Sequence, residues 1–327
     1  MMKSYFWKKG RGLETDLSRA QMLSAIQDKD SLLWVDLEAP SEFESECLVE
    51  IFNFHDLAIE DCLVDQSQPK VDDYGEYLFI VLHAVTSKND EEKGIEELAT
   101  KELDIFFSKN YVVTFHKVPV KTVNAVRESV IKNPERWLGQ GSDILVHTLL
   151  DHLVDNYMPV LNQYDEKIDK LEEEIFNNPP ANYLSTVLQV KQDVFNLRRT
   201  IAPQRDTINY LIRNPEHFIR VKHLAYFRDV YDHLFRIYSA AEVFHENLAN
   251  ILQAYFSYSS HKLNEVVKHM TVLATLTMPA IIIASIYGMN FHYMPELDWK
   301  FGYPFSIGLA AVISITMLVW MKFKKWI

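Results

Sequence analysis

Cysteine and glycine are scarce in this 327-residue chain. Its two cysteines, Cys47 and Cys62, form no zinc-binding pattern with histidine and are typical of a reducing compartment. Nine glycines leave little material for a loop that cradles phosphate, and no such motif occurs. A His-Glu-x-x-His motif, a serine elbow and a paired nucleophile and base are also missing, so we expect no enzyme and no nucleotide partner. The first residues lack the apolar core of a signal peptide.

Basic side chains are fewer than acidic ones over most of the chain. Residues 1–260 hold 27 basic and 42 acidic side chains, which gives a net charge of −15, whereas residues 261–327 hold six lysines and three acids. An acidic body disfavours nucleic acid as a partner and attracts cations. The sequence therefore predicts an acidic cytosolic body on a small membrane base.

Charge is absent from two runs near the C-terminus. Neither Met270–Met289 nor Phe301–Met321 contains an ionised residue, and each run has about the 20 residues that a helix needs to cross a bilayer. We expect membrane spans at about 270–290 and 302–321, joined by an outer loop at 291–301. Three lysines follow the second span, so the positive-inside rule places both termini in the cytoplasm.

The first span carries a narrow stripe of uncharged residues. A projection at about 100° per residue aligns them on one helix face. They are Gln253, Ser260, Asn264, Val267, Thr271, Met278, Ile282, Ser285 and Met289. Such a face suits a helix that lines a water-filled axis between identical copies. Small and hydroxylated residues also suit a packing seam between membrane helices, so the pattern alone leaves both interpretations open.

A combination of motifs surrounds the end of this span. Tyr287-Gly288-Met289-Asn290 is followed by Met294-Pro295-Glu296-Leu297, by the second span and by a Lys-Lys-Trp-Ile end. This combination resembles the CorA family of magnesium and cobalt ion channels. The resemblance extends to Tyr226–His233 and, more loosely, to Gln68–Val71 and Tyr77–Leu82. It implies a funnel-shaped homopentamer in the inner membrane that takes up Mg²⁺, Co²⁺ and, as a further candidate, Ni²⁺.

The same resemblance implies that Gly288, Met289 and Asn290 form the selectivity filter. Mg²⁺ sheds water reluctantly, so we expect the Asn290 carboxamide, one per subunit, to bind the hydrated ion, while Gly288 lets the helix end turn. We expect a pore lined by Asn264, Val267, Thr271, Met278, Ile282 and Ser285. Pro279 has no N–H to donate to the carbonyl of Thr275. Either this carbonyl oxygen is available to water in the pore, or Pro279 simply kinks the helix.

Two further groups of acids concern regulation and ion entry. Glu296 and Asp298 either concentrate cations in the outer loop or keep that loop soluble. The resemblance implies that Mg²⁺ between neighbouring cytosolic domains closes the channel, that Asp229 is one carboxylate of that site, and that Asp90 is its candidate partner. Acidic surfaces that abut repel each other until a divalent ion bridges them. Gln253 stands where the family often has an acidic residue low in the stalk. The sequence therefore does not predict a tight ion-binding site at that position.

The pattern predicts an α+β body followed by long helices. We expect a cytosolic α/β domain at 1–118, a helical region at 119–258 that includes the start of a long stalk helix, and a transmembrane region at 259–327. The expected strands are 32–37, 77–86, 102–107 and 111–116, and an exposed loop is expected at 87–97. The expected helices are 41–54, 142–177 and 182–214, with a kink or interruption at Pro203, and one helix that runs from Leu224 to the outer face.

Other residue patterns have ordinary explanations. His147 with Asp151, or His152 with Asp155, could share a metal on one helix face, but histidines at helix contacts are commoner. The acidic run from Asp165 to Glu174 is interleaved with lysine and is typical of a solvated helix face. Two alternative functions remain: a zinc-transporting relative of the same fold, and a membrane-anchored sensor without transport.

Overall fold

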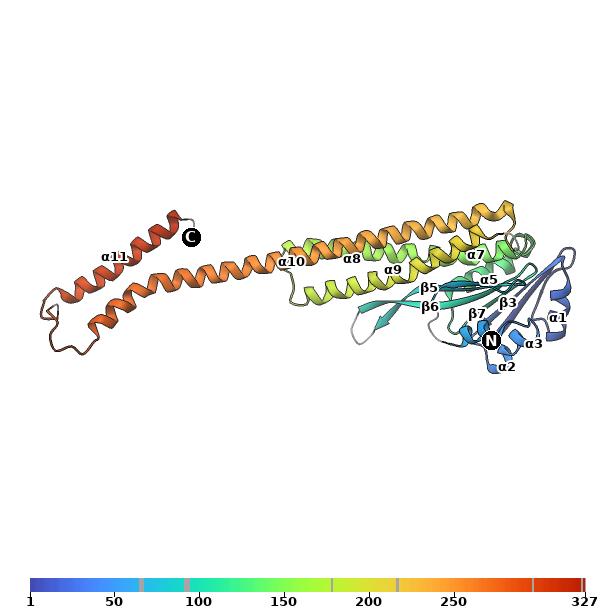
Figure 1. Cartoon of the computed structure of the whole chain (residues 1–327), viewed down its shortest axis with the longest axis horizontal. Helices are drawn as coiled ribbons and strands as arrows, with labels where there is room; N and C mark the ends of the chain where they lie inside the picture. Colours follow the sequence, from blue (N-terminus) through green and yellow to red (C-terminus); the bar gives the residue numbers. More distant parts are fainter. Residues whose placement is uncertain are drawn as a thin grey trace. The chain divides into compact units, whose positions relative to one another are not determined.

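The computed structural model describes residues 1–64, 68–90, 95–177, 179–215, 218–295, 297–324 and 326. Its chain divides into two compact units, Met1–Ile251 and Leu252–Ile327, which are described separately below. Figure 1 shows the strands and helices of both.

A seven-stranded mixed sheet is the centre of the first unit (Figure 1). Its order is β2-β1-β3-β7-β6-β5-β4, and only β3 and β7 pair in parallel. The strands are β1 Met2–Lys8, β2 Gly12–Thr15, β3 Ser31–Glu38, β4 Lys70–Asp73, β5 Leu78–Asp90, β6 Ile95–Phe107 and β7 Tyr111–His116. Central strands β3 and β7 are buried along almost their whole length because helices cover both faces of the sheet. The strands predicted at 32–37 and 111–116 are thereby confirmed.

Helices on the two faces create two different environments. One face packs an aromatic-rich core with α1 (Arg19–Gln27) and α4 (Asp56–Leu63), to which Met22 and Cys62 belong. The other face is contacted by α7 (Ser142–Asp155) and α9 (Tyr183–Arg213). Two more helices follow β7: α5 (Lys121–Lys132) adjoins α7, and α6 (Pro134–Trp137) adjoins α5 and β2. The sheet is thus the middle layer of an α+β body.

The helix expected at 41–54 is wrong in its length. Ser41 begins it with a capping box shared with Glu44, as the sequence pattern suggests. The structure then has two short helices, α2 (Glu42–Ser45) and α3 (Cys47–Glu50). Asn53 adopts a left-handed conformation with φ of 51°, which ends helical structure before Phe54. Phe54 instead stacks on Phe106 with ring centroids 3.9 Å apart.

The loop expected at 87–97 is also wrong for most of its backbone. β5 and β6 continue as an antiparallel ladder to the pairs Ser87↔Leu98 and Asp90↔Ile95. Residues 91–94 of the expected loop lie outside the described residues. Pairing of 13 residues on each strand extends the hairpin well beyond the predicted strand 77–86.

The helix expected at 142–177 is divided at Asn156. Pro159 has no N–H for the carbonyl of Asp155, which weakens the helix at this point. The Asn156 amide donates to the carbonyl of His152 at 2.8 Å and to the Thr122 hydroxyl at 3.0 Å. Helix α8 (Tyr157–Phe176) follows.

The remaining helical predictions agree better with the structure. Helix α9 matches the range expected for 182–214 and is uninterrupted at Pro203. A short 3-10 turn, η1 (Val221–His223), leads into α10 (Leu224–Tyr287), which confirms the single long helix expected from Leu224 onward. The boundary between the two units falls within α10.

The second unit contains the end of α10 and the helix α11 (Gly302–Phe323), which form a hairpin (Figure 1). Among the described residues, these two helices are long and apolar enough to cross a membrane. The Ser314 hydroxyl on α11 donates to the carbonyl of Leu276 on α10 at 2.9 Å. Large apolar side chains such as Ile281, Val312 and Ile315 are each about three-fifths exposed, which suits contact with lipid.

Candidate functional site

The first part of the candidate site is the end of α10, where the helix stops at Tyr287. The N–H of Gly288 still donates to the carbonyl of Ala284 at 2.9 Å, and the N–H of Met289 donates to that of Ile286 at 3.3 Å. Asn290 follows directly and is exposed. Its carboxamide therefore stands just past the end of an uncharged helix, where a neutral oxygen can meet a hydrated cation.

Gly288 has a steric role that the sequence analysis did not foresee. Its φ is not among the positive values in the chain, so no left-handed turn requires glycine here. An added Cβ would instead lie 3.0 Å from the Ala284 carbonyl oxygen, closer than ordinary van der Waals contact. Glycine thus lets the helix end keep its last backbone hydrogen bond without displacement.

The predicted pore-lining residues lie along α10, and five of the six are exposed in the single chain. Val267, Met278 and Ile282 are about half exposed or more. Asn264 and Ser285 are exposed as well, while Thr271 is partly buried and donates its hydroxyl to the carbonyl of Val267 at 2.8 Å. Hydroxyl and amide groups therefore recur among apolar side chains, and none of these six residues is charged.

Part of the same stripe also borders α11. A pocket of about 190 Å³ is lined by Thr275, Met278, Pro279, Ile282 and Ile283 of α10 and by Ile313 and Met317 of α11. Thr275 donates its hydroxyl to the carbonyl of Thr271 at 2.7 Å, one turn before the missing N–H of Pro279. Met278 and Ile282 thus lie at the border between the exposed stripe and the α10–α11 contact.

The predicted outer-loop acids are described only in part. Asp298 is exposed, whereas Glu296 lies outside the described residues. Trp299 packs edge-on to Phe301 and, tilted, against Phe305, with ring centroids 6.4 and 5.5 Å apart. Aromatic side chains at a helix start are typical of a membrane–water interface.

The second part of the candidate site is an acidic cluster between α7 and α10 in the first unit. Ligand atoms of Asp151, Asp229 and His233 all lie within 4.8 Å of one another. Neighbouring Phe227 and Val230 are fully buried, which fixes this turn of α10 while Asp229 stays about two-thirds exposed. His233 Nε2 lies 3.8 Å from Asp229 Oδ1. Two carboxylates and an imidazole at this spacing could hold a divalent cation.

His147 borders this cluster. Burial lowers the pKa of His147, and the charges of Asp151 and Asp229 partly offset that effect. His147 itself packs its ring against Tyr226 and Phe227, with centroids 5.3 and 5.9 Å away. The pairing of His147 with Asp151 considered from the sequence is therefore replaced by one in which α10 supplies the partners.

Asp90, the predicted partner of Asp229, is the last residue of β5, and its side chain lies outside the described part of the structure. The sequence analysis missed Asp151 as a partner of Asp229, and it missed His233 altogether. His233 is four residues after Asp229 on one helix, a spacing that could have indicated it. Asp151 is 78 residues away, and only the fold brings it close.

Comparisons with known proteins identify the family of the chain. Residues 29–325 match the family model described as CorA-like Mg²⁺ transporter protein. The chain is 38% identical over 278 residues to a cobalt/magnesium transport protein CorA of Thermotoga maritima, covering 85% of this chain and 78% of the relative. It is 35% identical over 294 residues to a putative metal ion transporter, YfjQ, of Bacillus subtilis, covering 90% and 89%.

A solved structure extends the likeness to the fold. The complete structure of the CorA magnesium transporter from Methanocaldococcus jannaschii matches with a TM-score of 0.81 and 19% identity, covering 99% of this chain and 98% of the other. The predicted fold class, an α+β body with a long helix and two C-terminal candidate spans, is thereby confirmed.

Proposed function

Because the chain belongs to the CorA-like Mg²⁺ transporter family, we propose that it is a divalent cation channel that admits Mg²⁺ and Co²⁺ to the cell. The observation that carries the proposal is the uncharged, exposed face of α10, which leads to Gly288, Met289 and Asn290 at the helix end. Family membership gives the class of cargo, and this face gives the route.

The route requires several copies of the chain. One α10 cannot enclose water, so we propose a homopentamer in which the six lining residues face a common axis. Asn264, Thr271 and Ser285 would offer neutral oxygens there, and Val267 and Met278 would narrow the route and gate it by excluding water. Asn264, Val267 and Ser285 are exposed in the single chain, which supports the assignment because a pore face meets other subunits, whereas Met278 and Ile282 also border α11.

Selectivity in this proposal rests on the Asn290 carboxamide. Mg²⁺ prefers six oxygens and loses its water slowly, so a ring of carboxylates would bind it too tightly for conduction. Amide oxygens accept hydrogen bonds from the hydration shell without a full charge. Close packing at Gly288 would hold this ring at a fixed height above the helix end.

Membrane potential supplies the driving force. A divalent ion gains about 4.6 kcal/mol on entering a cell interior that is 100 mV negative, at ~2.3 kcal/mol per charge. This energy suffices for accumulation without nucleotide hydrolysis. We place the protein in the inner membrane with both termini in the cytoplasm, as the lysines after α11 favour.

A channel of this kind must close when the Mg²⁺ concentration inside the cell is high enough. Asp151, Asp229 and His233 could hold a regulatory Mg²⁺ with a carboxylate of the neighbouring subunit, for which Asp90 is the candidate. Their ligand atoms fit a divalent ion because they lie within 4.8 Å of one another and two of the three groups are carboxylates. The bound ion would neutralise carboxylates that otherwise repel, and so hold neighbouring subunits together.

The proposal is tested by Mg²⁺ flux into liposomes that contain the purified protein and a Mg²⁺-sensitive dye. Asn290→Ala should abolish potential-driven Mg²⁺ uptake while the oligomer elutes as in wild type. Asn162→Ala, an exposed asparagine on α8, is the matched control and should leave flux unchanged. Wild-type flux by Asn290→Ala would remove this residue from the filter.

The same liposomes separate the alternatives. Uptake of Zn²⁺ that Mg²⁺ does not compete with would favour a zinc transporter. Absence of flux for Mg²⁺, Co²⁺ and Zn²⁺ in the wild type would favour a membrane-anchored sensor and refute the channel.

A further inference from the structure

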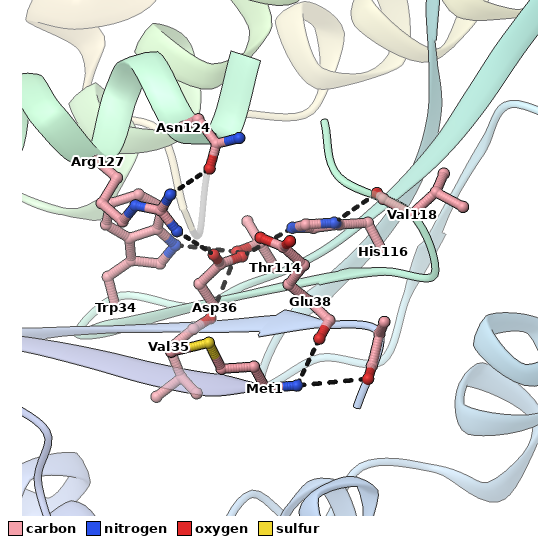
Figure 2. A network of polar contacts seen from close by, with 11 residues as sticks. Met1, Trp34, Val35, Asp36, Glu38, Thr114, His116, Val118, Asn124 and Arg127 are labelled. Carbon is pink, nitrogen blue, oxygen red and sulfur yellow. Dashed lines mark hydrogen bonds and ion pairs between the residues drawn. The ribbon is translucent and has the colours of Figure 1, made fainter. Parts of the chain in front are cut away.

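A buried polar cluster lies at the end of the two parallel strands β3 and β7 (Figure 2). These strands belong to the first unit, whereas the residues of the proposed ion route belong to the second. Asp36 and Glu38 come from β3, and His116 comes from β7, where it pairs in register with Glu38. Ligand atoms of the three side chains lie within 4.8 Å of one another. Asp36 and His116 are each only 1% exposed, whereas Glu38 is partly exposed.

The surrounding contacts orient these groups as they would around a metal ion. His116 Nδ1 lies 2.8 Å from the carbonyl of Val118, and Nε2 lies 3.1 Å from Asp36 Oδ1 (Figure 2); in the neutral tautomer in which Nδ1 donates to Val118, Nε2 carries a lone pair that can bind a metal. The Thr114 hydroxyl donates to Asp36 Oδ1 at 2.7 Å and accepts a hydrogen bond from Trp34 Nε1 at 3.1 Å. Supporting hydrogen bonds of this type fix the tautomer and the direction of metal ligands.

One oxygen of the cluster is left without a donor. Asp36 Oδ2 is buried and accepts no hydrogen bond from the described residues. The nearest cation, Arg127 Nη1, is 3.7 Å away, beyond hydrogen-bond distance, while Arg127 Nη2 donates to Asn124. Arg127 Nη1 likewise has no hydrogen-bond partner among the described residues, so this long ion pair leaves both buried atoms unsatisfied, and an additional ligand at the Asp36 oxygen is favoured.

The spacing of the two closest ligand atoms fits one ion between them. His116 Nε2 and Asp36 Oδ1 are 3.1 Å apart. Two atoms that bind the same metal at about 2.0 to 2.2 Å are separated by roughly 3 Å when the angle at the metal is near 90°. Arg127 opposes a cation here, and the second carboxylate, from Glu38, offsets that repulsion.

We propose that Asp36, Glu38 and His116 bind a transition-metal dication of the Zn²⁺, Co²⁺ or Ni²⁺ class. The imidazole nitrogen and the buried position select these ions over Mg²⁺, which prefers oxygen ligands and retains several waters. This site is separate from the cluster around Asp229, where both carboxylates are less buried.

Metal retention by the full-length protein in detergent tests the proposal. The protein is stripped with a chelator, loaded with Zn²⁺ in the presence of excess Mg²⁺, washed, and its Zn²⁺ content per chain is measured. Glu38→Gln and His116→Gln should each lower Zn²⁺ affinity at least about tenfold, because each removes a ligand. Glu42→Gln, an exposed acid on α2, and His233→Gln, in the other cluster, should retain this Zn²⁺.

Substitution with Co²⁺ gives a second readout that depends on the ligands themselves. A visible d–d band should appear on addition of one Co²⁺ per chain and should change in Glu38→Gln, a partly exposed position at which the fold is expected to survive. Zn²⁺ retention and a Co²⁺ band that are indifferent to both Glu38→Gln and His116→Gln would overturn the proposal. The cluster would then be an ion-paired network of Asp36, His116 and Arg127 without metal.

Discussion

Replacement of Asp229 by asparagine should make the metal-free protein more stable and the Mg²⁺-loaded protein relatively less stable. The change removes one negative charge from a cluster in which the ligand atoms of Asp151 and Asp229 lie within 4.8 Å. Asparagine has nearly the same shape, and Asp229 is about two-thirds exposed, so little packing is lost. The main effect is therefore electrostatic.

The repulsion between the two carboxylates sets the magnitude. At the 4.8 Å limit, two unit charges repel by about 0.9 kcal/mol in water and by about 3.5 kcal/mol at an effective dielectric constant of 20. Because Asp229 is largely exposed, we expect a value near 1 kcal/mol. Such a gain raises the melting temperature of a body of this size by about 2 to 4 °C.

The assay is thermal unfolding of wild type and Asp229→Asn at pH 8, with chelator and with increasing Mg²⁺. At a Mg²⁺ concentration of 100 times the dissociation constant, the free energy of unfolding of wild type should rise by about 2.7 kcal/mol, and that of the variant should rise by less. Plots of melting temperature against Mg²⁺ concentration for the two proteins should therefore cross. Asp232→Asn, an exposed acid on the same helix, is the control. A variant less stable than wild type in chelator would show that Asp229 stabilises the fold through His233 and would refute the repulsion argument.

Three further outcomes follow from the same structure. Asp229→Lys should leave Mg²⁺ flux active at high internal Mg²⁺, and normal inhibition would contradict the regulatory assignment. Gly288→Ala should lower flux without changing assembly, because the new Cβ would press on the Ala284 carbonyl at 3.0 Å; unchanged flux would contradict this steric role. Burial raises the pKa of Asp143, but hydrogen bonds from Arg220 and His223 lower it by a larger amount, so this pKa lies below its usual range. This stabilisation is present above pH ~4 and is lost as pH falls through the depressed pKa, so Asp143→Asn should cost about 1.5 to 3 kcal/mol at pH 7 and progressively less in acid, as thermal unfolding at each pH would show.

The sequence predicted the elements whose pattern is local and strong. Uncharged runs and apolar periodicity placed α10 and α11, and β-branched and aromatic residues placed β3 and β7. Predictions failed where one residue decides a boundary. The helix expected to reach Phe54 is two short helices, the second of which ends at Glu50 before the left-handed Asn53, and Pro159 divides α7 from α8. The loop prediction failed at Ser87 because cross-strand pairing overrides a polar composition.

Candidate sites divide in the same way. Gly288 to Asn290 could be found because the motif is contiguous and follows a span. The Asp151–Asp229–His233 cluster joins α7 to α10 across 78 residues, and the Asp36–Glu38–His116 cluster joins two strands that are separated by three helices and three strands in the chain. The spacing of residues in one sequence does not indicate such contacts. The pairing of β3 with β7 brings the second cluster together, and the packing of α7 near α10 brings the first together.

The three sites differ in charge in the way that their proposed tasks require. An ion must leave a conducting route as readily as it enters, so neutral oxygens along α10 bind weakly and repeatedly. A sensor must instead bind tightly over a narrow concentration range, and the paired carboxylates at Asp229 provide that affinity through the repulsion that a dication relieves. Around His116 the imidazole and one carboxylate are both buried, whereas His233 and Asp229 are more exposed and would leave room for the waters that Mg²⁺ retains, so the buried site would prefer softer ions. Under these proposals an assembly of identical chains would pass one dication, sense it and hold a different one, provided that no charged side chain enters the conducting face.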